Sequence, residues 1–216
     1  MIRMKSKASV IKFGGISLIL AGILFFVQYL FMLPLPSPPL TDTGLMFWLQ
    51  EWRFNISMAD EVLIFAALLL IPSAVALYRV LVKVSPIQTM LGCGLLAVNI
   101  PVYLFLVIIL GRWVYPVYEI ELSPDLYRLV ISLYYGGMHC TALILGAATI
   151  LLSLVTRKSG LGRFTAYLGL TAGIFDFIGS FPWLIGTAVM FTSQLLSAAW
   201  FVLLGVQLLG KTQLDD

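Results

Sequence analysis

One carboxylate stands deep inside a long apolar run of this chain, and it is the residue best placed to do chemistry. Asp176 lies in the stretch GLTAGIFDFIGSFPW, Gly169–Trp183, which carries no other charged side chain. Placing a carboxylate in hydrocarbon costs roughly 2.5–3.5 kcal/mol on insertion scales. Asp176 must therefore be solvated, paired or protonated. The structural interpretation is that it reaches outward to water or caps the turn after its helix, and the alternative is a proton or cation site or a ligand contact.

Three other polar residues fall near mid-membrane in separate apolar runs, whereas Asp176 is expected in the outer third. They are His139, the single histidine of the chain, with Asn99 and Gln194. A hydrogen bond between helices is the structural interpretation of His139, and its ordinary pKa near ~6.5 makes a pH-responsive role the alternative. Together with Asp176 these residues form the candidate ligand or proton site. Their convergence on one cavity is a hypothesis that depends on the tertiary arrangement.

Other membrane chemistries lack their residues. The chain has no CxxC pair, no GxSxG serine and only one histidine, so we expect no metal site, no cofactor and no catalytic set. Cys93 and Cys140 lie in apolar runs and are predicted to be buried free thiols. An intramembrane enzyme that uses Asp176 and His139 as an acid–base pair is the least favoured alternative, because the two residues lie on different helices.

The elements that carry these residues are predicted from composition. The chain is 61% hydrophobic and 11% charged, with a mean hydropathy of +1.03, whereas soluble domains are about a quarter charged. Long apolar runs without alternation cross a bilayer as helices of about 20 residues. We expect an all-α, polytopic integral membrane protein, with residues 1–216 forming a single domain. The six transmembrane helices predicted are Phe13–Leu33, Val62–Val82, Met90–Leu110, Leu129–Leu151, Phe164–Phe181 and Ile185–Leu209.

Charge placement predicts the orientation of these six spans. With the N-terminus inside, the basic residues expected on the cytoplasmic side are Arg3, Lys5, Lys7, Lys12, Arg79, Lys83, Arg157, Lys158, Arg163 and Lys211. The other side receives Arg53, Arg112 and Arg128 together with most of the acids. This positive-inside bias predicts that both termini are cytoplasmic. The charged N-terminal segment is read as the start of a retained first span, because no signal-peptide cleavage site follows it.

The longest connection, Pro34–Asp60, is predicted to be external. Within it, Gly44–Phe54 is expected to form a short interfacial helix between the first two spans. Trp48 and Trp52 on that helix are predicted interfacial anchors, and a lid over an outward-facing cavity is the alternative. Ser57 and Asp60 resemble a capping box that would begin the second span.

Small and capping residues predict helix packing and helix ends. Gly169 and Gly173 form a GxxxG pattern, which lets helices approach closely. The Ser-Pro pairs that begin at Ser85 and Ser123 are typical of helix starts, and Gly160 of a helix end.

The C-terminal third resembles a bacterial family of multi-span membrane proteins known as domain of unknown function 4386. The matching residues are Arg157-Lys158-Ser159-Gly160, Arg163, Leu168-Gly169-Leu170, Ala172-Gly173, Trp200 and Leu203-Leu204-Gly205. The resemblance covers about the last 60 residues and the overall span pattern. It implies six or more helices in a bacterial inner membrane, and it supplies no mechanism or catalytic residues.

Two functions remain open besides the enzyme. The favoured interpretation is a non-enzymatic protein of the bacterial plasma membrane with an accessory, sensory or structural role. The alternative is a small-molecule binding or transport subunit with a polar site near mid-membrane. The expected partners are the lipid bilayer and either a small-molecule ligand or another membrane protein, with no nucleic acid.

Overall fold

The computed structural model describes residues 2–181 and 183–214, and the side chains of residues 9–181 and 183–211. Within these residues the chain is helical, and its elements are α1 (Ile2–Met32), α2 (Asp42–Glu51), α3 (Arg53–Leu81), α4 (Pro86–Val114), the 3-10 helix η1 (Val117–Glu119), α5 (Pro124–Thr156), α6 (Arg163–Gly179) and α7 (Thr187–Leu214). The predicted all-α class is confirmed.

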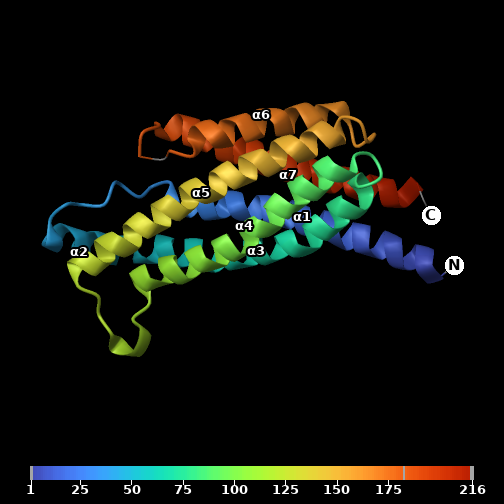
Figure 1. Ribbon diagram of the computed structural model, residues 1–216. Coiled ribbons are helices and arrows are strands. Elements are labelled where there is room, and N and C mark those ends of the chain that lie inside the picture. The colour runs from blue at the N-terminus through green and yellow to red at the C-terminus, as the bar shows by residue number, and fades with distance from the viewer. Residues whose placement is uncertain (1, 182, 215–216) are drawn as a thin grey trace.

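The long helices run side by side as an elongated bundle (Figure 1). Helix α1 packs against α3, α3 against α4, α4 against α5, α5 against α6 and α6 against α7, and α7 returns to α1. The helices therefore form a closed ring in chain order. The first turn of α1 and the last turn of α7 lie at the same end of this ring (Figure 1).

Five of the described helices are long and apolar enough to cross a membrane, namely α1, α3, α4, α5 and α7. By the length and composition of these helices, the chain is a multi-pass membrane protein. Helix α6 has 17 residues and is the shortest helix of the ring. Because a helix rises about 1.5 Å per residue, α6 covers less of the bundle's length than the other helices.

Helix starts follow the predicted capping residues in two places. Pro86 and Pro124 occupy the first turns of α4 and α5, after N-caps at Ser85 and Ser123. The Ser123 hydroxyl accepts a hydrogen bond from the backbone N–H of Leu126 at 3.5 Å. Gly160 has a positive φ of 72° in the turn after α5, a conformation that glycine adopts without steric cost. These local predictions are confirmed.

The predicted helix start at the Ser57 capping box is wrong. Helix α3 begins at Arg53, so Ser57 lies inside it and caps nothing. Asp60, which we expected outside the span, is 6% exposed and buried in the bundle. The Asp60 Oδ2 lies 3.2 Å from the place that a Cβ on Gly111 of α4 would occupy, so the glycine leaves room for the carboxylate.

Close approach between helices depends on glycines. A Cβ added at Gly173 of α6 would lie 2.8 Å from the carbonyl oxygen of Gly146 on α5, and one at Gly205 of α7 would lie 2.7 Å from the carbonyl oxygen of Gly15 on α1. Backbones that touch in this way leave no space for a side chain between them. The predicted packing role of Gly173 is confirmed.

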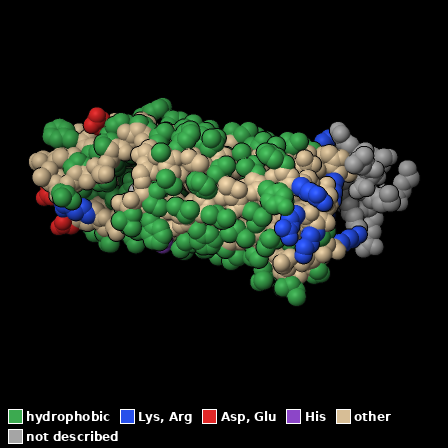
Figure 2. Space-filling model, turned by 90° about the horizontal axis from the view of Figure 1, so that it is seen from above, with side chains coloured by type: hydrophobic (Ala, Val, Ile, Leu, Met, Phe, Trp, Pro, Cys, Tyr) green, Lys and Arg blue, Asp and Glu red, His purple; other side chains and the backbone are tan. Residues whose placement is uncertain are grey.

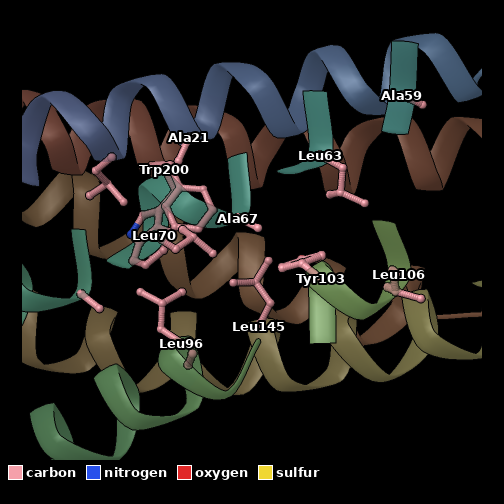
Figure 3. Packing of buried hydrophobic residues seen from close by; sticks show 14 of the residues in the cluster. Ala21, Ala59, Leu63, Ala67, Leu70, Leu96, Tyr103, Leu106, Leu145 and Trp200 are labelled. Atoms are coloured by element: carbon pink, nitrogen blue, oxygen red, sulfur yellow. The ribbon is translucent and has the colours of Figure 1, made fainter. Parts of the chain in front are cut away.

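The interior of the ring is filled over part of its length by large apolar side chains. Leu70, Leu96, Leu145 and Trp200 come from four different helices and meet there (Figure 3). Cys93 is buried, as predicted, but Cys140 is exposed on the outside of the ring. The prediction of a second buried thiol is wrong, because Cys140 lies on the opposite face of α5 from the residues that enter the core.

Charged side chains gather at the two ends of the bundle and leave the middle apolar (Figure 2). Lysines and arginines collect at the end that holds the chain termini, while the acids lie at the other end together with a smaller basic cluster. We call these the basic end and the acidic end. At the acidic end, Arg128 of α5 pairs with Asp42 of α2 and Asp125, and it donates to the carbonyl oxygen of Leu40 at 2.7 Å.

Candidate functional site

Asp176 lies in the last turn of α6 and points into the ring. Its side chain is 3% exposed. The carboxylate oxygen Oδ1 accepts hydrogen bonds from the hydroxyls of Ser193 and Ser197 on α7, both at 2.8 Å. The second oxygen, Oδ2, is buried without a hydrogen-bond partner among the described residues. Asp176 therefore neither reaches outward to water nor caps the following turn.

A largely enclosed cavity of about 60 Å³ lies beside this carboxylate. A cavity needs a volume of roughly 10–15 Å³ to hold one water molecule, so this cavity has room for several water molecules. Helices α1, α4, α5, α6 and α7 all contribute to its wall, which places it in the centre of the ring. We call this cavity the chamber, and its lining residues are Phe25, Gln28, Tyr103, Met138, Thr141, Ala142, Leu145, Asp176, Gly179, Ser180, Met190, Gln194, Ser197, Ala198 and Phe201.

A second and more open cleft, of about 180 Å³, adjoins the chamber toward the acidic end. Gln28, Met138 and Met190 line both spaces and so form a neck between them. The Gln28 amide donates a hydrogen bond to the Tyr134 hydroxyl at 3.2 Å. We call the outer cleft the vestibule.

The shortness of α6 explains why the vestibule exists. Helix α5 has 33 residues and α6 has 17, and α6 ends at Gly179, alongside His139 of α5. The part of α5 before His139 therefore extends beyond α6 (Figure 1). Tyr134, Tyr135 and Met138, which line the vestibule, belong to this uncovered part.

His139 holds the end of α6 against α5. Its Nδ1 lies 2.6 Å from the carbonyl oxygen of Ser180. The imidazole also packs against the rings of Phe181 and Trp183, with centroids 4.7 Å and 5.6 Å away. The structural interpretation of His139 as an interhelical hydrogen-bonding residue fits this geometry. His139 and Asp176 bond to different partners, so the contacts give no support to an acid–base pair.

The structure separates the four predicted site residues. Asp176 and Gln194 both line the chamber. Asn99 is fully buried one layer behind it and donates through Nδ2 to the carbonyl oxygen of Thr141 at 3.3 Å. His139 contributes through Ser180, whose backbone it contacts and which lines the chamber. Asp176 and Gln194 thus form the site, and Asn99 and His139 support the helices around it.

Helix α2 forms close to the expected position, and it is packed against the bundle. Trp48 is 3% exposed; its ring lies 6.0 Å from that of Trp113, and its Nε1 donates to the carbonyl oxygen of Pro36 at 3.1 Å. Trp52 is half-buried, and Phe47 is the large exposed residue of this helix. Trp48 therefore holds α2 to the bundle through protein contacts.

Sequence reasoning missed several polar residues of the site. Ser193 and Ser197 are spaced by one helical turn in the last apolar run, a spacing that puts both hydroxyls on one face and that could have been noticed. Gln28 is the polar residue near the end of the first apolar run, and Tyr103 carries a hydroxyl on α4. Asp60 is a second buried carboxylate, and it lies outside the residues that line the chamber.

Comparisons with known proteins add no relative. No family model matches the chain, and no match was found among curated proteins or among solved structures. The resemblance to domain of unknown function 4386 therefore remains a hypothesis without support from these comparisons.

Proposed function

We propose that this chain is a non-enzymatic membrane protein that binds a small molecule in the chamber, either as a binding subunit or as a carrier. The observation that carries the proposal is Asp176, which lines a cavity in the ring and whose buried Oδ2 has no hydrogen-bond partner among the described residues. A buried acceptor without a partner is costly, by about 1–3 kcal/mol or more when charged. A bound donor would offset that cost.

The path into the chamber supports binding from one side. The vestibule, the neck at Gln28 and the chamber follow one another from the acidic end toward the centre of the ring. On the basic side of the chamber, Leu70, Leu96 and Leu204 are at most 1% exposed and fill the ring. The geometry is that of a site which is open at one end and closed at the other.

We propose that the acidic end faces outward across the plasma membrane of a bacterium and that the basic end is cytoplasmic. The distribution of lysine and arginine follows the positive-inside rule in this orientation. Helix α6 would be the sixth crossing, since 17 residues is at the lower limit of about 17–25 that span a bilayer. Both chain termini would then be cytoplasmic.

Cysteine labelling in intact cells tests this orientation. Cysteines replace Tyr118, which is 92% exposed near the acidic end, and Lys158, exposed near the basic end, in a chain without Cys93 and Cys140. A membrane-impermeant maleimide should label the Tyr118→Cys protein in intact cells and the Lys158→Cys protein only after lysis. The reverse pattern, or labelling of both in intact cells, would refute the orientation.

Accessibility of the chamber tests the proposed function. In the same cysteine-free background, Gln194→Cys places a thiol in the chamber, and Leu195→Cys places one on the outer surface of the same helix, where Leu195 is 45% exposed. In membranes, a small charged methanethiosulfonate added from the outside should modify Gln194→Cys but not Leu195→Cys, because lipid excludes charged reagents. Equal and negligible modification of both would favour an accessory or structural role instead.

A further inference from the structure

We infer that the chamber selects a small organic cation, a primary ammonium with a short apolar body, over neutral and anionic molecules of the same shape. This inference rests on the proposed function and names the class of ligand. The ammonium would donate a hydrogen bond to Asp176 Oδ2, the oxygen that α7 leaves free.

The geometry at Asp176 favours a donor that carries a positive charge. Ser193 and Ser197 both donate to Oδ1, which holds the carboxylate in one orientation, and Oδ2 has no hydrogen-bond partner among the described residues. Hydrogen bonds between an ammonium and a carboxylate are roughly twice as strong as those between neutral groups. A primary ammonium supplies that bond and the missing countercharge together.

The surrounding charges point in the same direction. Among the residues that the structure describes, no lysine, arginine or histidine lines the chamber. Asp176 lies three residues before the end of α6, where the aligned peptide dipoles carry partial negative charge. A negative side chain at a negative helix end is an unfavourable arrangement that a bound cation reverses. At the entrance, the acids of the acidic end attract cations toward the vestibule.

Aromatic rings on the chamber wall suit an organic cation. Phe25, Tyr103 and Phe201 all line the chamber. The Phe25 ring lies 4.9 Å from that of Tyr103 and 6.3 Å from that of Phe201, measured between centroids. Ring faces attract cations within about 6 Å, and they also bury an alkyl body.

Two substitutions test this inference, one at the site and one on the surface as a control. Asp176→Asn keeps the size and the acceptor oxygen of the side chain but removes its charge. Glu51→Gln removes one charge from the exposed surface of α2, far along the bundle from the chamber. Both variants change the net charge of the protein equally, so only the position of the lost charge differs.

The experiment compares three probes of one shape: isobutylammonium, isobutanol and isobutyrate. Binding to the purified protein in detergent is measured by thermal stabilisation and by equilibrium dialysis, at constant ionic strength. We expect isobutylammonium to bind to the wild-type protein at least about tenfold more tightly than the other two probes, which corresponds to about 1.4 kcal/mol. Asp176→Asn should remove this preference, and Glu51→Gln should retain it.

The outcomes distinguish recognition of the ligand's charge by Asp176 from binding by the cavity alone. Equal binding of isobutylammonium and isobutanol would overturn the cation inference and leave the binding function standing, with Asp176 acting as a neutral hydrogen-bonding group. Tighter binding of sodium or calcium than of isobutylammonium would also overturn it. The wild-type comparison decides the question even where Asp176→Asn fails to fold. Failure of the proposed function itself is read separately, from the thiol labelling of Gln194→Cys.

Discussion

Replacement of Gly173 by alanine tests the contact that places Asp176 in the chamber. A Cβ at this position would lie 2.6 Å from Ile150 Cγ1 and 2.8 Å from the carbonyl oxygen of Gly146. Favourable separations between carbon atoms are about 3.5–4.0 Å, so the overlap with Ile150 is about 1 Å. One of the two contacts is backbone, and it cannot be relieved by a change of rotamer. Helix α6 must therefore move away from α5.

The expected magnitude follows from two opposing effects. Overpacking of a filled interface costs about 1–3 kcal/mol, while alanine in place of glycine favours the helix by about 1 kcal/mol. The control is Gly136→Ala on α5, where an added Cβ would have no heavy atom within 4 Å. The control receives only the favourable effect, so the two variants should differ by about 1–3 kcal/mol in the free energy of unfolding, with Gly173→Ala the less stable.

Reversible unfolding of the purified protein in mixed micelles, titrated with dodecyl sulfate and followed by circular dichroism, measures this difference. Because Asp176 follows Gly173 by less than one turn, binding of isobutylammonium to Gly173→Ala should also weaken, whereas Gly136→Ala should bind as the wild type does. Equal stability of the two variants would refute the close contact between α5 and α6, and with it the position assigned to Asp176.

Three further predictions concern the neck, the end of α6 and the thiols. Tyr134→Phe removes the acceptor of the Gln28 hydrogen bond and frees the neck, so thiol modification in the chamber should become faster; an unchanged rate would show that this bond does not limit entry. His139→Ala removes the contact with the carbonyl oxygen at the end of α6. The loss of about 0.5–1.5 kcal/mol should speed amide exchange in residues 180, 181 and 183–186 by about two- to twelvefold, and unchanged exchange would contradict a holding role. In detergent, a maleimide should modify the exposed Cys140 readily and the buried Cys93 only after unfolding. Mass spectrometry of peptides distinguishes the two cysteines. Equal modification of both in the folded protein would contradict the packing of α4.

Local features of the chain were predictable because they depend on neighbours in sequence. Apolar runs of helical length, the Ser-Pro starts of α4 and α5, and the glycine after α5 all act over a few residues. Asp176 was recognisable as unusual for the same reason, since its cost in an apolar run does not depend on the fold. The start of α3 was not predictable in this way, because burial of Asp60 requires Gly111 on another helix.

The site itself was decided by the tertiary structure. Helical periodicity shows which residues of one helix share a face, but it does not show which face of the next helix lies opposite. Closure of the ring from α7 back to α1 brings Gln28 and Asp176 to one cavity, although more than half of the chain separates them. The packing of the helices also brings Gln194 to the chamber, whereas Asn99 and His139 lie outside the residues that line it. The sequence by itself determined that a costly carboxylate lies among apolar helices. Only the packing of those helices determined that Asp176 lines a cavity and that Ser193 and Ser197 hold one of its oxygens.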